Sequence, residues 1–204
     1  MSSGDIERRS FLGAAGLVLA TPTVSLAASG KPQVVITTSH GVIVVELEAQ
    51  KAPITSANFL RYVDAGAYDD GVFFRASRDP GAPKQGTIVG RPRAKVLPYP
   101  PIRHESTTKT GLRHTTGTIS LGRFAPGTAT NNFFICASPE PYLDAHPGAP
   151  GDNLGYAAFG QVVKGMPVVR KILSLPTNGK SEYADQRGQW LSPPVPIRSM
   201  RRAT

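Results

Sequence analysis

The sequence is poor in cysteine and in charge. Its only cysteine, Cys136, has no partner for an intramolecular disulfide. Cys136 follows three apolar residues, which favours a small buried side chain over a reactive nucleophile. Charged residues make up only 18% of the chain, which argues against long solvated helices.

The sequence also lacks the motifs of several enzyme classes. It has no glycine-rich phosphate loop, no nucleophile elbow and no dinucleotide-binding turn. Paired carboxylates at strand ends, as needed for acid/base hydrolysis, are missing as well. The histidines show no metal-ligand spacing, so each is expected to be an exposed loop residue: His40, His104, His114 and His146. An enzyme with this sequence would need neither a metal, a cofactor nor a nucleophile.

Glycine, proline and apolar residues are frequent. The 21 glycines and 19 prolines favour many turns and short strands. With 204 residues, 40% of them apolar, the chain suits one well-packed domain better than two. We therefore predict a single β-rich domain.

The N-terminus has the pattern of an export signal. Arg8 and Arg9 precede an apolar run from Phe11 to Ala20, which is the order of a twin-arginine signal peptide. That run is too short for a stable membrane span. Small residues lead up to Ala27, so residues 1–27 are predicted to be removed by cleavage after Ala27. A disordered or amphipathic N-terminal helix is the alternative interpretation.

Export predicts a periplasmic protein without a membrane span after cleavage. The formal net charge is +9, and the predicted signal holds two basic and two acidic groups, so its removal leaves the charge unchanged. A basic chain is typical of nucleic-acid binding, but export argues against that partner. We expect the charge to serve solubility or contact with acidic clients and envelope surfaces.

Strand signals recur along the chain. The first two, residues 33–39 and 42–48, flank Gly41, whose tolerance of a positive φ favours a hairpin. Further extended segments are expected at 71–77, 87–89, 117–121, 132–137, 156–163 and about 195–200. The last of these is expected to pair with the first. Residues 78–86 hold two prolines, two glycines and no apolar period, and predict a surface loop.

Two helices are expected. One of about three turns follows Pro53, with Thr55 or Ser56 as its N-cap and Gly66 as its stop. The second covers residues 165–173, with an apolar face and a proline in its first turn.

Several segments, in matching order, resemble the cyclophilin family of peptidyl-prolyl isomerases, especially its bacterial periplasmic members. The matching stretches are APITSANFLRYVDAGAYDDGVFFR (52–75), TGLRHTTGTISLGR (110–123), TATNNFFICAS (128–138), YLD (142–144) and GYAAFGQVVKGMPVV (155–169). The resemblance implies a cyclophilin-like domain over residues 33–201: a closed eight-stranded antiparallel β-barrel capped by two α-helices. It also implies proline-containing polypeptide clients and no cofactor, and we expect a monomer.

The reaction of such an enzyme is a bond rotation. The X-Pro bond crosses a barrier of about 18–20 kcal/mol because twisting destroys amide resonance. A fixed donor aimed at the prolyl nitrogen binds the twisted state better than either planar isomer. The resemblance places the catalytic arginine at Arg75, whose guanidinium keeps its charge at any working pH. The strand pattern alone favours a surface charge for Arg75.

The resemblance also implies substrate-binding residues. Phe134 corresponds to the floor of a proline pocket, with Leu143 beside it and Thr87 as a wall, while Gly122 and Arg123 face the substrate backbone. The remaining members of the set are Phe74, Val89, Asn132, Tyr142 and Tyr156. Ordinary core positions for Phe134 and Leu143 are the alternative.

The sequence departs from the family pattern within this set. Phe74 and Tyr156 replace histidines of other members, Asn132 replaces a glutamine, and Tyr142 replaces a Trp or Phe. Val89 stands where a second glutamine normally positions the arginine, and Gln85 is the one glutamine nearby.

Two main hypotheses follow from these residues. The first is a prolyl isomerase for exported proteins. The second is a catalytically weak or inactive module that binds proline-containing peptides as a chaperone does. A basic nucleic-acid binder is the third interpretation.

Overall fold

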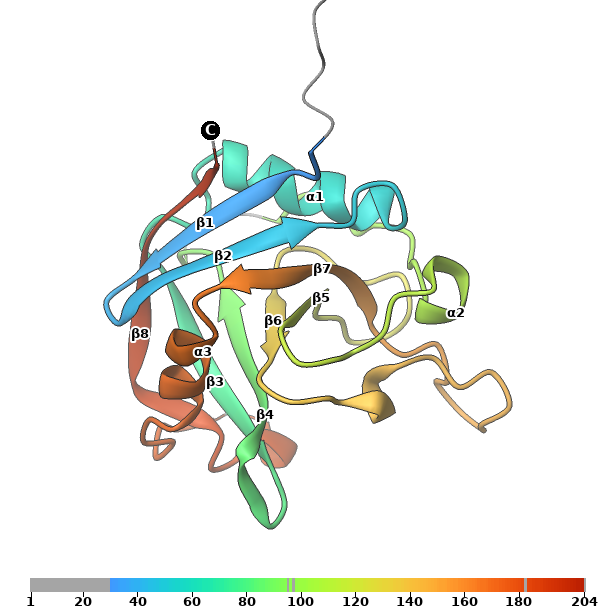
Figure 1. The fold of residues 1–204 in the computed structure, drawn as a ribbon. Helices are drawn as coiled ribbons and strands as arrows, with labels where there is room; N and C mark the ends of the chain where they lie inside the picture. Colours follow the sequence, from blue (N-terminus) through green and yellow to red (C-terminus); the bar gives the residue numbers. More distant parts are fainter. Residues whose placement is uncertain (1–29, 95, 97, 182, 204) are drawn as a thin grey trace, which may run out of the picture. The chain divides into compact units, whose positions relative to one another are not determined.

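The strands close into an antiparallel barrel in the order β1-β2-β7-β5-β6-β4-β3-β8 (Figure 1). The structure is a computed structural model that describes residues 30–94, 96, 98–181 and 183–203. The predicted signal peptide, residues 1–27, lies outside the described residues. The predicted fold class, mainly β with a closed eight-stranded barrel, is confirmed.

Two pairings explain how the barrel closes. β1 and β2 form the predicted hairpin through Gly41, which has a φ of 132°. β8 pairs with β1, as predicted, and also with β3, so the two ends of the sheet meet. The strands are β1 (Gln33–Thr38), β2 (Gly41–Leu47), β3 (Gly71–Asp79), β4 (Ala82–Arg91), β5 (Thr118–Leu121), β6 (Phe133–Cys136), β7 (Ala157–Lys164) and β8 (Trp190–Arg202).

The main core fills the barrel. Alternate residues of β1 and β2, such as Val34, Ile36 and Ile43, are fully buried, which is the period of two expected for a sheet with one inner face. Phe133 lies at the centre and meets Phe59 and Phe73 edge-on, with ring centroids 5.7 and 5.6 Å apart. Because side chains fill the interior, a substrate can bind only outside the barrel wall.

Both predicted helices are present. α1 (Pro53–Asp64) lies across the top of the barrel in Figure 1, beside the C-terminal end of β8, and α3 (Met166–Leu173) lies lower, against β4. Each buries an apolar face in the main core. The prediction of two helices was incomplete, because the structure has a third, α2 (Thr107–Thr110). Its single turn is too short to produce an apolar period. Two 3₁₀ turns, η1 (Pro141–Leu143) and η2 (Ala184–Gln186), complete the set.

The predicted N-cap of the first helix was wrong. The helix begins at Pro53, and neither Thr55 nor Ser56 caps it. Glu105 does so from a distant loop: its carboxylate accepts hydrogen bonds from the backbone N–H groups of Ile54 (3.1 Å) and Thr55 (2.8 Å). The cap is therefore a tertiary contact.

The predicted surface loop at residues 78–86 was also wrong. β3 continues to Asp79 and β4 begins at Ala82, so the segment is the tip of a hairpin. This hairpin projects below the barrel in Figure 1, and residues 83–85 are exposed. No buried face imposes an apolar period there, which is why the sequence looked irregular. β8 likewise begins at Trp190, earlier than predicted, because its prolines hid the strand signal.

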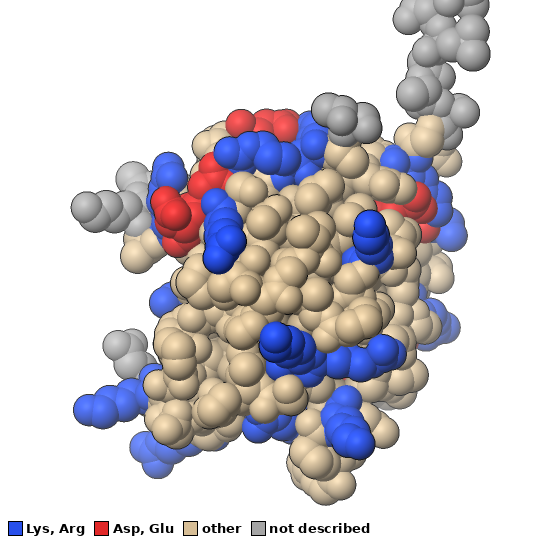
Figure 2. Space-filling view, turned by 60° about the vertical axis from the view of Figure 1, so that its left-hand side comes forward, with Lys and Arg blue, Asp and Glu red and all other residues tan. Residues whose placement is uncertain are grey.

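The end of β8 is tied to α1 and to the turn that follows it. Arg202 pairs with Asp64 and Arg201 with Asp69, each at 2.6 Å. In the face shown in Figure 2, acidic side chains gather toward the upper part, whereas basic ones are spread over the surface. The basic surplus is therefore dispersed on this face.

Candidate active site

A second apolar cluster lies on the outer face of the barrel wall. On β6, Phe133 and Ile135 belong to the main core, whereas Phe134 and Cys136 point the other way. The outer cluster consists of Phe74, Val89, Phe134 and Cys136, with Val72, Leu143, Tyr156 and Trp190 packed against it. Five of the predicted site residues are therefore brought together: Phe74, Val89, Phe134, Leu143 and Tyr156.

A bulge in β3 directs two consecutive side chains outward. Phe73 pairs with Gly90 and Arg75 with Val89, so Phe74 is an extra residue without a partner. Phe73 faces the main core and Phe74 joins the outer cluster. Since Val89 points outward and cross-strand partners share a face, Arg75 lies on the outer face as well.

Arg75 belongs to a row of residues that crosses four strands. It pairs with Trp190 of β8 on one side and with Val89 of β4 on the other. Val89 in turn pairs with Phe134 of β6. The row therefore places Arg75 and Phe134 on the same surface, two strands apart.

The Arg75 guanidinium has an unusual environment. The residue is half-buried, and within the described part of the chain its Nε atom is buried without a hydrogen-bond partner. Burial lowers the pKa of this guanidinium below its ordinary value, while Tyr156, Asp185 and Tyr142 act in the opposite direction. The group therefore has an unused donor beside the outer cluster.

Neither candidate for the supporting glutamine reaches this donor. Val89 has no polar side-chain atom, although it is the direct partner of Arg75. Gln85 is exposed on the projecting hairpin, and among the described residues no hydrogen bond joins it to Arg75. Within the described residues, no side-chain amide therefore supports the Arg75 guanidinium at its Nε atom.

Aromatic rings surround Phe134. Tyr156 meets it edge-on, with ring centroids 5.4 Å apart and an interplanar angle of 90°. His114 stacks on it, with a centroid distance of 5.8 Å and an angle of 15°. These contacts hold the Phe134 ring in one orientation.

His114 is buried, which corrects the prediction of an exposed loop residue. Only 2% of it is exposed. Its Nδ1 lies 2.7 Å from an Asp144 carboxylate oxygen and its Nε2 lies 3.0 Å from the Ser120 hydroxyl. The sequence pattern could not show this burial, because the partners of the two ring nitrogens come from other segments. Asp144 lies 30 residues further along the chain and Ser120 lies on β5.

Ser120, His114 and Asp144 are connected in the same order as a Ser-His-Asp catalytic triad, but a substrate cannot reach them. Ser120 is fully buried, so no substrate carbonyl can reach its hydroxyl. Burial lowers the pKa of His114, and Asp144 opposes that effect. A neutral ring donates from Nδ1 to Asp144 and accepts from Ser120, which makes the trio a fixed support under Phe134. Within the described residues no group of His, Cys, Asp and Glu is arranged to hold a metal ion.

Arg123 is directed inward. Its side chain is 4% exposed and donates hydrogen bonds to Asp152 (2.5 Å) and to the carbonyl of Gly155 (2.8 Å). Its guanidinium lies 5.2 Å from the centre of the Tyr156 ring. Next to it, the Gly122 N–H donates to the Asn132 carbonyl at 2.7 Å. Arg123 therefore supports Tyr156 with its side chain, and only its backbone is free to face a substrate.

Thr87 and Tyr142, like Gly122, Arg123 and Asn132, lie outside the outer cluster. Thr87 is buried on β4 opposite Cys136, and Tyr142 is 62% exposed on η1.

Sequence reasoning missed Trp190 and Arg91. Trp190 meets Phe74 edge-on at 5.1 Å, and the Arg91 guanidinium lies 4.8 Å from the centre of the Phe74 ring. Trp190 is the sole tryptophan of the chain, so composition could have singled it out, but the residues around it show no strand period.

Fold and site together define a protein class: a closed antiparallel barrel that carries an apolar cluster and a half-buried arginine on its outer face. The family model "Cyclophilin type peptidyl-prolyl cis-trans isomerase/CLD" matches residues 33–202. The chain therefore belongs to the cyclophilin-type family of peptidyl-prolyl cis-trans isomerases, and the predicted enzyme class is confirmed.

Individual relatives agree with this placement. The chain is 36% identical over 160 residues to peptidyl-prolyl cis-trans isomerase A of Dickeya dadantii, covering 78% of this chain and 80% of the relative. It is 34% identical to an isomerase of Acinetobacter baylyi, covering 79% and 82% of the two chains. The crystal structure of a Cryptosporidium parvum cyclophilin has a TM-score of 0.66 at 19% identity, covering 84% of this chain and 99% of that one. This last similarity supports the fold.

Proposed function

We propose that the protein isomerises X-Pro bonds of exported polypeptides, with Arg75 as the catalytic residue. The observation that carries this proposal is the row in which Arg75, Val89 and Phe134 share the outer face. The Cryptosporidium cyclophilin was crystallised in the presence of the dipeptide Ala-Pro, which supports a proline-containing peptide as the ligand class.

The proposed mechanism needs only a ring surface and a donor. The prolyl ring packs on Phe134 and Leu143, while the Arg75 guanidinium faces the prolyl nitrogen. In the twisted state that nitrogen regains a lone pair, and a charged donor stabilises it more than it stabilises either planar isomer. No proton is transferred and no covalent bond breaks. Because the Nε atom of Arg75 is buried, the terminal N–H groups of this half-buried guanidinium are the donors for this task.

Replacement of Arg75 tests the catalytic role. Arg75→Ala is expected to lower kcat/KM for an Ala-Pro peptide by about 10²–10³-fold, the usual effect of removing one preorganised donor. Exchange NMR measures the rate, and a fluorescence titration of the sole tryptophan, Trp190, measures peptide binding, which should persist. Lys84→Ala, on the exposed hairpin, is the control and should behave as wild type. Equal rates in Arg75→Ala and wild type would remove Arg75 from the mechanism.

The missing amide beside Arg75 favours a reduced rate and can be restored. Val89→Gln places an amide on the direct cross-strand partner of Arg75, where its oxygen can accept from the guanidinium. We expect kcat to rise by about tenfold, because a fixed donor is a better catalyst than a mobile one. Val89→Leu is the control for size. If the wild type binds peptide without accelerating isomerisation, the protein is the binding or chaperone module instead.

We also propose that the protein acts in the periplasm as a monomer. The periplasmic location is supported by the order of the twin arginines, the apolar run and the small residues before position 28. Within the described residues no helix is long and apolar enough to cross a membrane.

A further inference from the structure

Two exposed aromatic rings meet beside the candidate active site. Phe124, in the loop between β5 and β6, is 76% exposed, and Tyr183, in the loop between α3 and β8, is 45% exposed. Their ring centroids are 6.3 Å apart, at an interplanar angle of 43°. We call these two residues the aromatic pair. Packing in the barrel core does not explain why two large aromatic rings are exposed at neighbouring loops.

The Phe124 loop is fixed to one side of the site. Phe124 follows Arg123, whose guanidinium donates to the Gly155 carbonyl and lies over the Tyr156 ring. Tyr156 in turn packs against Phe134. The position of Phe124 is therefore coupled to the proposed proline-binding rings through a short chain of contacts.

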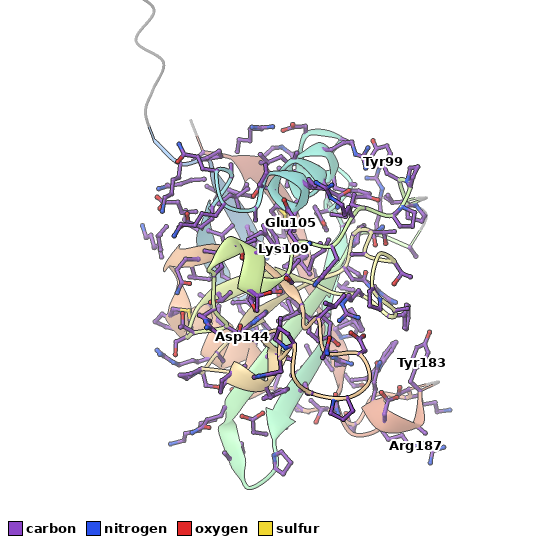
Figure 3. The ribbon with its side chains drawn as sticks, turned by 90° about the vertical axis from the view of Figure 1, so that its right-hand side faces the viewer. Tyr99, Glu105, Lys109, Asp144, Tyr183 and Arg187 are labelled. Atoms are coloured by element: carbon purple, nitrogen blue, oxygen red, sulfur yellow. The ribbon has the colours of Figure 1, made fainter. Side chains whose placement is uncertain are left out.

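The Tyr183 loop is fixed next to Arg75. The Ala76 N–H, next to Arg75, donates to the Gln189 carbonyl at 2.8 Å, and Trp190 is the cross-strand partner of Arg75. The Trp190 indole N–H donates to the Gln186 side chain at 3.2 Å, which holds η2 against the strand. Figure 3 shows Tyr183 and Arg187 on the part of this loop that projects from the barrel.

We propose that the aromatic pair is a subsite for an apolar side chain of the client polypeptide, at a position flanking the proline. This inference rests on the proposed function. A client whose proline lies on Phe134 must continue along the wall on both sides, at about 3.3 Å per residue. The two loops border Arg75 and Phe134, so the chain passes the pair within a few residues. Aromatic rings recognise apolar side chains through buried area and geometry.

The proposal predicts a preference that depends on both rings. Proline peptides with Leu or Phe at flanking positions should bind more tightly than the same peptides with Gly. In the double variant Phe124→Ala/Tyr183→Ala, affinity for the Leu- and Phe-flanked peptides should fall about tenfold, while affinity for the Gly-flanked peptide should change less than about twofold. Phe124→Leu/Tyr183→Phe should keep most of the preference.

Trp190 fluorescence provides the binding measurement, and exchange NMR provides kcat/KM for the same peptides without a coupling protease. Val163→Ala, which truncates an exposed apolar residue on β7, is the matched control. Equal losses for all peptides in the double variant would overturn the subsite, as would a wild type without preference. Since binding is read without turnover, a preference in a protein with no isomerase activity would refute the proposed function and leave the subsite standing.

Discussion

Arg75 and Phe74 face the same side because of one extra residue in β3. Strict alternation would place neighbouring side chains on opposite faces of the barrel wall. The bulge gives the outer face an arginine and an aromatic ring in succession, and Ala76 returns to the main core. Bulges of this kind are a common way to redirect a side chain at an active site.

His114 makes stability depend on pH. Burial holds its folded-state pKa below the unfolded value of about 6.5. As pH falls through and below about 6.5, the unfolded chain binds a proton that the folded chain resists, so the free energy of unfolding decreases. We expect His114→Gln to reduce this slope between about pH 7 and 5, measured by urea unfolding at several pH values.

The control for this experiment is His146→Gln, at an exposed position. It should keep the wild-type slope. The carboxylates whose pKa is lowered by arginine partners, Asp64, Asp69 and Asp152, lose their stabilising charge only in more acidic solution, below the window of the histidine. A wild-type slope in His114→Gln would contradict the assignment.

At the scale of the element, α1 depends on a cap from another part of the chain. Glu105 accepts from two backbone N–H groups of the first turn and from the Thr55 hydroxyl at 2.7 Å. Its charge also lies at the positive end of the helix dipole. These contacts join the loop before α2 to the helix that covers one end of the barrel.

Glu105→Ala is expected to lower the free energy of unfolding by about 1–2 kcal/mol, the usual effect of removing an N-cap. Urea unfolding measures the change. Glu46→Ala, which removes a carboxylate that contacts Lys31 and Gln33 on the barrel surface, is the control and should change stability by less than about 0.5 kcal/mol. Equal effects of the two changes would show that the cap adds nothing.

At the scale of the whole molecule, the proposed export can be tested directly. Arg8→Lys/Arg9→Lys removes the paired arginines without changing charge, and the variant is expected to stay in the cytoplasm at full length. The wild type should appear in the periplasm with Ala28 as its first residue. Fractionation and mass spectrometry distinguish the two outcomes, and export of the double variant at wild-type level would refute the twin-arginine route.

The barrel was predictable because its signals are local or carried by resemblance. The hairpin at Gly41, both long helices and the pairing of the first and last strands follow from turn chemistry, apolar period and matched segments. The resemblance predicted five residues of the outer cluster as site residues, whereas Val72, Cys136 and Trp190 were not predicted to belong to the site.

The sequence by itself determined the export pattern, the barrel class and the identity of the arginine expected to act on proline. Only the tertiary structure decided the direction of Phe74, the burial of His114, the cap from Glu105 and the meeting of Phe124 with Tyr183. The physical reason is range: periodicity reports which face a residue occupies on its own element. The direction of Phe74, the burial of His114, the cap from Glu105 and the aromatic contact depend instead on strand register or on a partner from another segment. A local sequence pattern contains no information on register or on distant partners.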